Sequence, residues 1–516
     1  MNASTPPPSD GIRYASARGR WVLAATILGS AIAAIDATVV GIALPAIGRD
    51  FDTGLSTLQW VVTAYTLTLA GLLLIAGALG DRYGRRRVFL IGVIWFALAS
   101  ALCGLAPGSG TLIAARALQG IGAALLTPGS LAILQASFAP DDRSKAIGAW
   151  SGFGGIATAI GPFIGGWFVQ AVSWRLIFFI NLPIAVAVVL VTTRHVPESH
   201  DTEATGRIDT SGGVLVTLGL IGLTYGLIEG PSSGWGSVPV ILALVLGVLM
   251  LVVFVRWEGR AEHPMLPLAV FRSRQFTATN VVTFIVYGAL AGALFLLPIQ
   301  LQQVSGYTPL QAGISLLPVT AIMLVLSARS GALASRIGPR LQMTVGPLIV
   351  GAGMALFARI DAGGNYLTEV FPAVVVFGLG LATTVAPLTS TALSSVTSRR
   401  SGIASAINND VARAAGLIAV AVLPAAAGIT GAAYLHPDQF SSGFHTAVLI
   451  SAGLCVVAGA VAALTIRNPR PEVRPEPIPA EEHALHCGLD APPPLLVTMG
   501  GPPDEEGFSP EPADRP

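Results

Sequence analysis

Residues 77–87, with the sequence GALGDRYGRRR, decide how this chain is interpreted. They place five charges and three glycines directly after the apolar run 63–79. A degenerate copy of this motif, GALASRIGPR, occurs 254 positions later at residues 331–340. A loop repeated in this way, each time at the end of an apolar run, predicts two halves that descend from one ancestral unit.

The composition predicts a membrane protein. Of the 516 residues, 53% are apolar and only 11% are charged, whereas soluble domains carry about 25% charged residues. The apolar residues fall in runs of about 17 to 25, the length of a helix that crosses a hydrocarbon core. Backbone groups in lipid must be hydrogen-bonded internally, and the runs are too long and too uniform for barrel strands. The predicted fold class is therefore an all-α polytopic membrane protein.

Fourteen spans can be placed along the chain. They are expected at 21–44, 58–79, 88–106, 111–134, 146–170, 176–193, 211–229, 238–256, 276–302, 309–328, 342–358, 370–391, 403–430 and 444–466.

The basic residues predict the orientation of these spans. If the N-terminus is cytoplasmic, 24 of the 29 basic residues fall in cytoplasmic segments, and only Arg49, Arg175 and Arg359 fall outside. The remaining two, Arg116 and Arg413, lie within spans. This bias follows the positive-inside rule, so we expect both termini in the cytoplasm, and dropping one span would destroy the alternation.

The repeated loop predicts the domain organisation. The first copy follows the second span and the second copy follows the tenth, so two extra spans separate the halves. Parallel repeats of this kind occur in secondary transporters, which bind substrate between the halves. We expect a cytoplasmic N-tail (1–20), a six-helix bundle (21–193), an inserted two-helix hairpin (211–256), a second six-helix bundle (276–466) and a disordered cytoplasmic tail (467–516) that contains thirteen prolines.

Four charged residues lie inside predicted spans, where charges are costly and usually functional. Asp36 lies in the first span, Arg116 in the fourth, and Asp410 and Arg413 in the thirteenth. Asp410 and Arg413 are three residues apart on one helix face and can pair with each other. For that pair, a role in stability is favoured over a role in transport.

Four motifs together carry a resemblance to a known family. They are the loop at 77–87, Leu112-x3-Arg116-x2-Gln119-Gly120-x-Gly122-Ala123-Ala124, the run IDATVVGIALP at 35–45, and a helix-five pattern that ends in Gly161-Pro162-Phe-Ile-Gly165-Gly166. Over roughly residues 20–466 the chain resembles the major facilitator superfamily, and within it the fourteen-helix drug–proton antiporters of the multidrug-resistance exporter type. The resemblance implies the major facilitator fold, with two six-helix bundles plus a two-helix insertion.

The resemblance implies that the loop latches the two bundles in the outward-facing state. The latch residues would be Gly77, Asp81, Arg82, Gly84, Arg85 and Arg86. Asp81 would lie against the start of the family's helix eleven, near residues 401–406, where a helix N-terminus favours negative charge. The alternative is a basic loop that only sets the topology. Ser335 replaces the aspartate in the second copy, so no latch is expected there.

The resemblance also links Arg116 to proton coupling. Asp36 is our candidate proton carrier, because an acid inside a span is either protonated part of the time or paired. The alternative is a purely structural pairing of Asp36 with Arg116. The subfamily's usual asparagine is Gly41 here, which removes one possible polar contact.

The helix-five residues Gly161, Pro162, Gly165 and Gly166 predict the direction of transport. Small residues and a proline make a smooth, kinked face on which another helix can slide. In the family this pattern is found in exporters. The alternative is ordinary packing of small residues, which would not indicate the direction of transport.

We therefore expect a proton-coupled exporter of small hydrophobic or cationic compounds, such as drugs and antibiotics, in a bacterial plasma membrane. The alternative is an exporter of one endogenous metabolite, such as a lipid, a siderophore or a self-made antibiotic. The chain has no GxxxxGK[ST] phosphate-binding loop and no HExxH motif, so we expect no enzyme activity, cofactor or metal. The expected partners are a small-molecule substrate, protons and the lipid bilayer, and no nucleic acid.

Overall fold

The computed structural model describes residues 11–200, 208–396, 401–431, 434 and 436–468. In this part of the chain the structure is helical, apart from loops and one backbone bridge between Ile12 and Phe138. The helices are α1 Ala17–Asp50, α2 Leu55–Tyr83, α3 Arg85–Gly104, α4 Ser109–Ser137, α5 Pro140–Ala171, α6 Leu176–Phe179, α7 Asn181–His195, α8 Thr210–Ser233, α9 Val238–Glu258, α10 Arg274–Ile299, α11 Pro309–Ser315, α12 Leu317–Ile337, α13 Pro339–Phe357, α14 Phe371–Ser394, α15 Ser401–Ala426 and α16 Pro437–Thr465, with short 3₁₀ or π turns at Leu268–Arg272, Gln300–Val304 and Tyr366–Val370.

The predicted number of spans is confirmed. Among the described residues, fourteen helical segments are long and apolar enough to cross a membrane, with α6–α7 and α11–α12 each counted as one. Several helices extend past the predicted ends because polar residues cap them. For example, α1 begins at Ala17 because the Ser16 hydroxyl accepts a hydrogen bond of 3.0 Å from the Gly19 backbone N–H.

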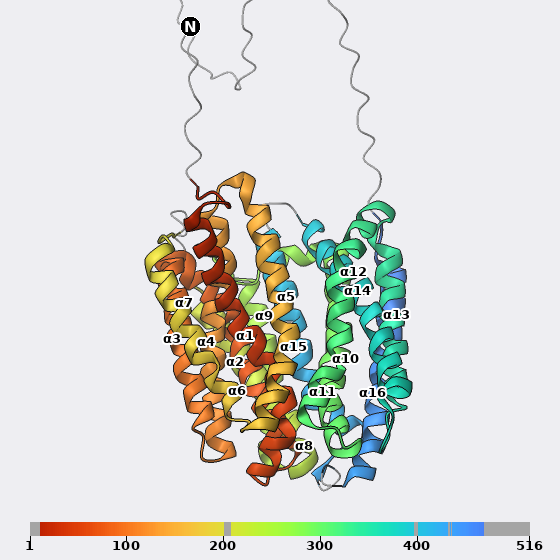
Figure 1. Cartoon of the computed structure of the whole chain (residues 1–516). Coiled ribbons are helices and arrows are strands. Elements are labelled where there is room, and N and C mark those ends of the chain that lie inside the picture. Colours follow the sequence, from red (N-terminus) through yellow and green to blue (C-terminus); the bar gives the residue numbers. More distant parts are fainter. Residues whose placement is uncertain (1–10, 201–207, 397–400, 432–433, 435, 469–516) are drawn as a thin grey trace, which may run out of the picture. The chain divides into compact units, whose positions relative to one another are not determined.

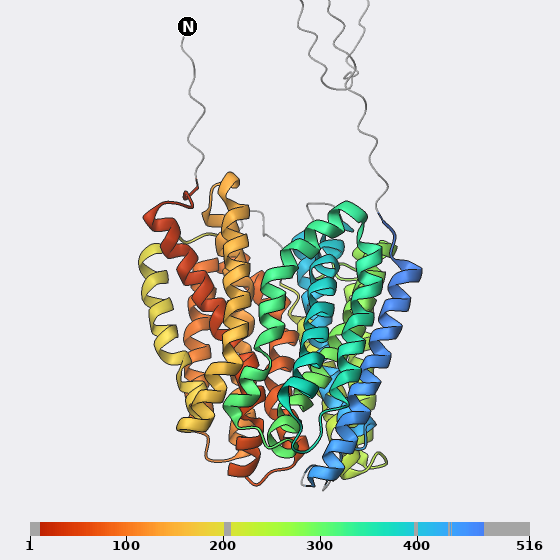
Figure 2. The same cartoon turned by 45° about the vertical axis from the view of Figure 1, so that its right-hand side comes forward.

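The helices of residues 11–468 run side by side along one axis (Figures 1 and 2). Helix α1 begins and α16 ends at the same end of this unit (Figure 2), which we call the near end. The far end is the opposite end, where α1 finishes at Asp50 and α16 begins at Pro437.

The fourteen segments form two six-helix bundles and an inserted pair. Helices α1–α7 pack mainly among themselves, and so do α10–α16, except that the short α11 packs mainly against α5. Helices α8 and α9 pack against each other, and α8 also contacts α2 of the first bundle and α15 of the second. Leu67, Leu220 and Leu417, from α2, α8 and α15, form one small apolar cluster at this junction. The domain boundaries given above stay predictions, and most of the predicted tail, 469–516, lies outside the described residues.

The two copies of the repeated loop adopt the same backbone geometry. Gly84 has φ +110° and Gly338 has φ +84°, values that side chains strongly disfavour. In each copy a residue just past the last helix of the bundle binds the backbone after the glycine. Glu198 Oε1 accepts from the Arg86 N–H, and Asn468 Oδ1 accepts from the Arg340 N–H, both at 3.0 Å. The sequence repeat is therefore a structural repeat.

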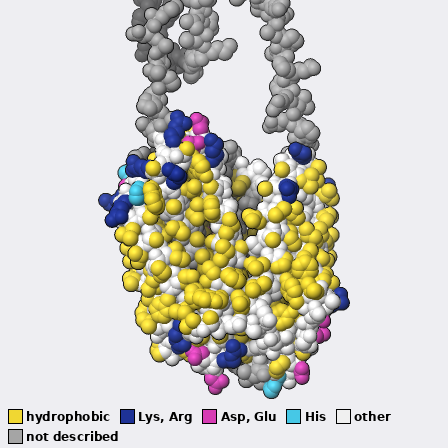
Figure 3. Space-filling model, in the orientation of Figure 1, with side chains coloured by type: hydrophobic (Ala, Val, Ile, Leu, Met, Phe, Trp, Pro, Cys, Tyr) yellow, Lys and Arg dark blue, Asp and Glu magenta, His cyan; other side chains and the backbone are white. Residues whose placement is uncertain are grey.

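Contacts between the bundles concentrate toward the far end. Gln59 Nε2, at the start of α2, donates to the Val420 carbonyl at 2.6 Å. Gln302 Nε2 donates to the Ile42 carbonyl at 3.0 Å. All described hydrogen bonds between the two bundles lie in this region, and Figure 3 shows the surface hollowed between the bundles at the near end.

The outer surface is suited to lipid. Figure 3 shows hydrophobic side chains over the middle of the visible face, with charged side chains gathered at its two ends. Helix α9 is an example of this apolar surface: its side chains Val245, Leu246, Val248 and Leu249 are all exposed. A wide exposed apolar band bounded by charges is expected of a membrane-spanning surface and not of a water-soluble one.

Candidate functional site

Asp36 and Arg116 form a buried ion pair inside the first bundle. Asp36 on α1 and Arg116 on α4 are each only 1% exposed, and Arg116 Nη1 lies 2.5 Å from Asp36 Oδ2. Arg116 Nε also donates to the Val61 carbonyl on α2 at 3.1 Å. The pairing with Arg116, given above as the alternative to a proton-carrier role for Asp36, is therefore present, and Arg116 links α4 to α1 and α2.

A ring of polar side chains completes the pair. Gln119, one turn after Arg116, accepts from Arg116 Nη1 at 2.7 Å and donates to Asp36 Oδ1 at 2.7 Å. Asn181 Nδ2 donates to Asp36 Oδ1 at 3.3 Å and to Ser100 Oγ at 3.0 Å. Both carboxylate oxygens of Asp36 therefore accept hydrogen bonds, as a buried charge requires.

The arginine also lies against aromatic rings. The guanidinium carbon of Arg116 is 4.3 Å from the centre of the Tyr65 ring and 5.8 Å from that of Phe178. Removing one partner of a buried ion pair leaves an uncompensated charge, which costs about 3–5 kcal/mol.

A cavity of about 350 Å³ lies beside this pair, between the bundles. Tyr65 and Arg116 form part of its wall, so the buried pair and the cavity adjoin. The lining comes from α1, α2, α4 and α5 of the first bundle and from α10, α15 and the start of α12 in the second. Its volume falls in the range of small-molecule sites.

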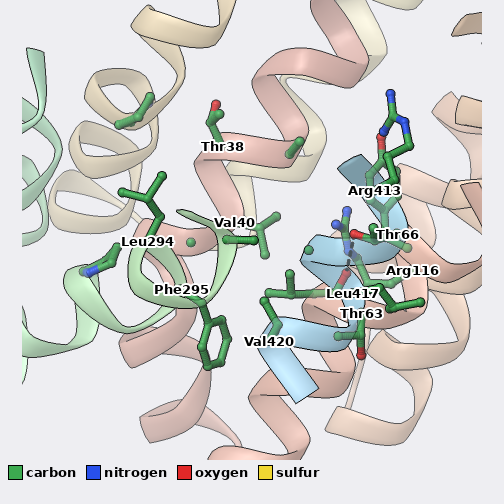
Figure 4. A pocket seen from close by; sticks show the side chains of 18 of the residues that line it. Thr38, Val40, Thr63, Thr66, Arg116, Leu294, Phe295, Arg413, Leu417 and Val420 are labelled. Carbon is green, nitrogen blue, oxygen red and sulfur yellow. Dashed lines mark hydrogen bonds between the residues drawn. The ribbon is translucent and has the colours of Figure 1, made fainter. Parts of the chain in front are cut away.

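The cavity has a polar side and an apolar side. Figure 4 shows Arg413, Thr66, Arg116 and Thr63 on one side, together with Leu417 and Val420 of α15. Leu294 and Phe295 of α10 lie across from them, with Val40 and Thr38 between. An apolar wall that faces a few polar groups is typical of a site that binds and orients an organic molecule.

The predicted pair of Asp410 and Arg413 is not formed in this conformation. Arg413 lines the cavity, whereas Asp410 does not. No hydrogen bond or ion pair joins the two described side chains, and Asp410 Oδ1 is buried without a hydrogen-bond partner. They are close enough to interact electrostatically, but no direct contact between the two charges is formed.

In the loop at 77–87, Asp81 pairs within its own segment. Its Oδ1 accepts from Arg85 Nε at 2.9 Å and lies 2.8 Å from Arg85 Nη2. No hydrogen bond or ion pair joins Asp81 to the described residues 401–406. The latch role of this loop therefore stays a prediction.

The arginines of the loop contact residues that follow α7. Arg86 Nη1 donates to the Val196 carbonyl at 3.1 Å, and Glu198 Oε2 lies 3.9 Å from Arg86 Nε and 3.7 Å from Arg87 Nε. Arg82 lies over the Tyr83 ring at 5.5 Å. Gly77 faces Pro128 of α4, where an added Cβ would make an ordinary contact at 3.8 Å.

The helix-five glycines serve two different contacts. A Cβ on Gly161 or Gly165 would collide with Thr38 or Val39 of α1, so these positions let α5 lie close to α1. A Cβ on Gly166 would lie 2.5 Å from the Pro309 carbonyl oxygen and 2.8 Å from Leu310 Cα. Pro162 and Gly166 thus lie where α5 of one bundle meets α11 of the other, at the far end.

Sequence reasoning missed three polar contributors. Asn181, which binds Asp36, was not singled out. Gln59, which bridges the bundles, and Glu198, which holds the repeated loop, were not singled out. An amide inside an apolar span is itself a signal, because its donors need partners, whereas Glu198 has no local signal in its polar segment.

In the described part of the chain, no group of three or more His, Cys, Asp or Glu side chains is arranged to hold a metal.

The two bundles, the cavity between them and the buried charges define the class, a helical membrane transporter of two related halves. The comparisons with known proteins agree. The sequence profile of the Major Facilitator Superfamily matches residues 26–421, more than half of the chain, and the chain belongs to this family.

Its relatives are named as resistance and export proteins. It is 36% identical over 429 residues to the tetracenomycin C resistance and export protein of Streptomyces glaucescens, covering 82% of this chain and 79% of the relative. It is 34% identical over 480 residues to the puromycin resistance protein pur8 of Streptomyces alboniger, covering 90% and 94%. The chain is thus of the drug-efflux type within the superfamily, a multi-pass membrane protein that acts on small molecules.

Solved structures support the fold. A bacterial homologue of the human lysosomal transporter Spinster, in an inward-facing conformation, matches with a TM-score of 0.62 at 17% identity, covering 87% of this chain and 96% of that one. A peptide transporter POT in complex with sulfate matches with a TM-score of 0.64 at 14% identity, covering 88% and 96%. At such identities the likeness concerns the fold alone, and the predicted major facilitator fold is confirmed.

Proposed function

We propose that this protein is a proton-coupled exporter of small hydrophobic compounds, such as drugs and antibiotics, that works by alternating access. The observation that carries the proposal is the buried Asp36–Arg116 pair in the wall of the central cavity. Relatives named for tetracenomycin C export and puromycin resistance support the direction of transport and the drug-like substrate.

The pair supplies a route for coupling. A proton that binds a carboxylate oxygen of Asp36 makes that side chain neutral and leaves Arg116 without its anionic partner. Because an unpaired buried charge is costly, the protonated state favours a different arrangement of α1, α2 and α4, which all contact this pair and line the cavity. A ligand or proton shifts such an equilibrium only through its different affinity for the two states.

We assign this conformation to the inward-facing state, with both termini in the cytoplasm. The distribution of arginines in the sequence supports this orientation. The described hydrogen bonds between the bundles then close the extracellular side, and the hollow at the near end opens to the cytoplasm. Asp81 would meet the start of α15 only after the near end closes, so the latch role of residues 77–87 belongs to the outward-facing state.

The alternative is export of a single endogenous metabolite. A relative from Streptomyces coelicolor is named as a probable actinorhodin transporter, at 34% identity over 434 residues. The alternative would use the same cavity and the same proton step. A deletion strain with normal drug susceptibility and one missing extracellular metabolite would favour it.

The test is dye efflux from cells with and without an uncoupler, in wild type and Asp36→Asn. We expect uncoupler-sensitive efflux in wild type and its loss in the variant. Asp141→Asn removes an exposed acid at the start of α5 and is the matched control.

Because Asp36→Asn leaves Arg116 unpaired, it can also destabilise the protein by about 3–5 kcal/mol. The double variant Asp36→Asn/Arg116→Gln removes both charges and separates folding from coupling. A well-folded Asp36→Asn protein that keeps full uncoupler-sensitive efflux would refute the proton assignment.

A further inference from the structure

Arg413 is the feature of the cavity that the pair of Asp36 and Arg116 does not explain. It lines the cavity from α15 and is half-buried. It makes no hydrogen bond or ion pair with any described residue. An arginine at the depth of a membrane needs a partner or water, so its five donors are available to a molecule in the cavity.

The other charges near the cavity do not neutralise this guanidinium by contact. Arg116 is paired with Asp36, and its donors also bind Gln119 and the Val61 carbonyl. Asp410 attracts Arg413 electrostatically from one turn earlier, but it lies outside the lining and its Oδ1 accepts no hydrogen bond. One positive charge therefore faces the cavity without a bonded anion.

The rest of the lining sets the shape of a suitable ligand. Across from the arginines, Leu294 and Phe295 form an apolar wall (Figure 4), and the lining also includes the apolar residues Pro298 and Leu316. A ligand that fills the cavity therefore places apolar, preferably aromatic, surface on α10 and a polar group toward α15.

We infer that the preferred substrates are amphipathic organic anions, in which an apolar ring system carries one carboxylate that Arg413 binds. This inference rests on the proposed function and narrows its substrate class. A guanidinium binds a carboxylate through two parallel hydrogen bonds, and burial strengthens that attraction. A cationic substrate would meet Arg413 as a like charge, so the cationic compounds expected from the sequence are disfavoured.

Binding to the purified protein tests the inference independently of transport. Equilibrium dialysis compares naphthoate, naphthamide and naphthylmethylamine, which share one ring system and differ in the charge of one substituent. We expect wild type to bind naphthoate most tightly and the amine most weakly. Arg413→Gln should weaken naphthoate binding about 10-fold or more, the value of a lost charge-assisted hydrogen bond, and leave naphthamide binding unchanged.

Two further variants make the result specific. Arg413→Lys keeps the charge but loses the planar fork, so we expect partial recovery of naphthoate binding. Arg329→Gln removes an exposed arginine on α12 and should leave naphthoate binding at the wild-type level. Wild type that prefers the amine would overturn the inference, as would Arg413→Gln that binds naphthoate normally or loses all three probes equally.

Uncoupler-sensitive efflux of the same probes, measured in cells, tests the proposed function separately. If naphthoate binds through Arg413 but its efflux ignores the uncoupler, the proton-coupled function fails and the anion site stands. If naphthamide efflux depends on the uncoupler but naphthoate does not bind, the function stands and the anion site fails.

Discussion

Replacing Gly166 with alanine should open the far end of the protein. Gly166 lies where α5 meets α11 of the other bundle, and an added Cβ would lie 2.5 Å from the Pro309 oxygen and 2.8 Å from Leu310 Cα. Both atoms belong to the backbone, so a rotamer change cannot relieve the collision. The bundles must separate at this contact, and the conformation closed at the far end loses stability.

The size of the effect follows from the steric cost. Forcing one extra methyl group into a packed contact costs about 1–3 kcal/mol, which changes a two-state equilibrium about 5- to 150-fold. If the far-open state is populated at about 1% in wild type, Gly166→Ala raises it to roughly 5–60%. Export should fall, because a protein that does not close at this end lets its substrate and the driving ion move without being coupled to each other.

Thiol labelling measures this shift. Leu294→Cys places a thiol in the cavity wall, and a membrane-impermeant maleimide is added from the far side. In a background with Cys487 replaced, the described native cysteines, Cys103 and Cys455, are buried. We expect labelling about 5-fold faster or more in Gly166→Ala, in line with the population shift above.

The matched control is Gly148→Ala on the same helix. A Cβ at Gly148 meets nothing within 4 Å, while the gain in helix propensity is the same for both variants. Equal labelling rates in Gly166→Ala and Gly148→Ala, or faster labelling from the near side only, would refute the closing role of this contact.

Three other glycines give testable predictions. Gly41→Asn should leave the melting temperature unchanged, because a Cβ there meets nothing within 4 Å. It should change the order of substrate preference, because Gly41 lines the cavity. A misfolded variant would contradict this prediction. Gly84→Ala and Gly338→Ala should each destabilise the protein by about 1–2 kcal/mol, because both positions have positive φ. Gly80→Ala, with free space at its Cβ, is the control, and thermal unfolding in detergent checks all three.

Much of the fold could be predicted from the sequence because membrane physics leaves few choices. Long apolar runs bounded by arginines indicated fourteen membrane spans, and fourteen helical segments long and apolar enough to span a membrane are present in the described residues. The repeated loop indicated two related halves, and Gly84 and Gly338 share the same unusual backbone. Helix ends were less predictable, because caps such as Ser16 extend helices into polar sequence.

The site could be predicted only in part. Asp36 and Arg116 were recognisable as charges inside apolar spans, and the structure brings them together. The cavity wall could not be predicted, because periodicity in an all-apolar span does not tell which face meets which helix. The pairing of Asp410 with Arg413 was inferred from their spacing on one helix, but in the structure Arg413 lines the cavity and Asp410 lies outside the lining.

We propose different roles for the two arginines inside the spans, Arg116 and Arg413. Arg116 has its anion inside the protein, so the free energy of that pair changes when a proton binds Asp36. Arg413 has no bonded anion in the described residues, so its free energy changes when a ligand enters. Both line one cavity of about 350 Å³ and lie above the contacts that close the far end. In the proposed mechanism, proton and substrate would therefore both act at the boundary between α2 and α15, where each would bias the same closure, and coupling would require no longer pathway.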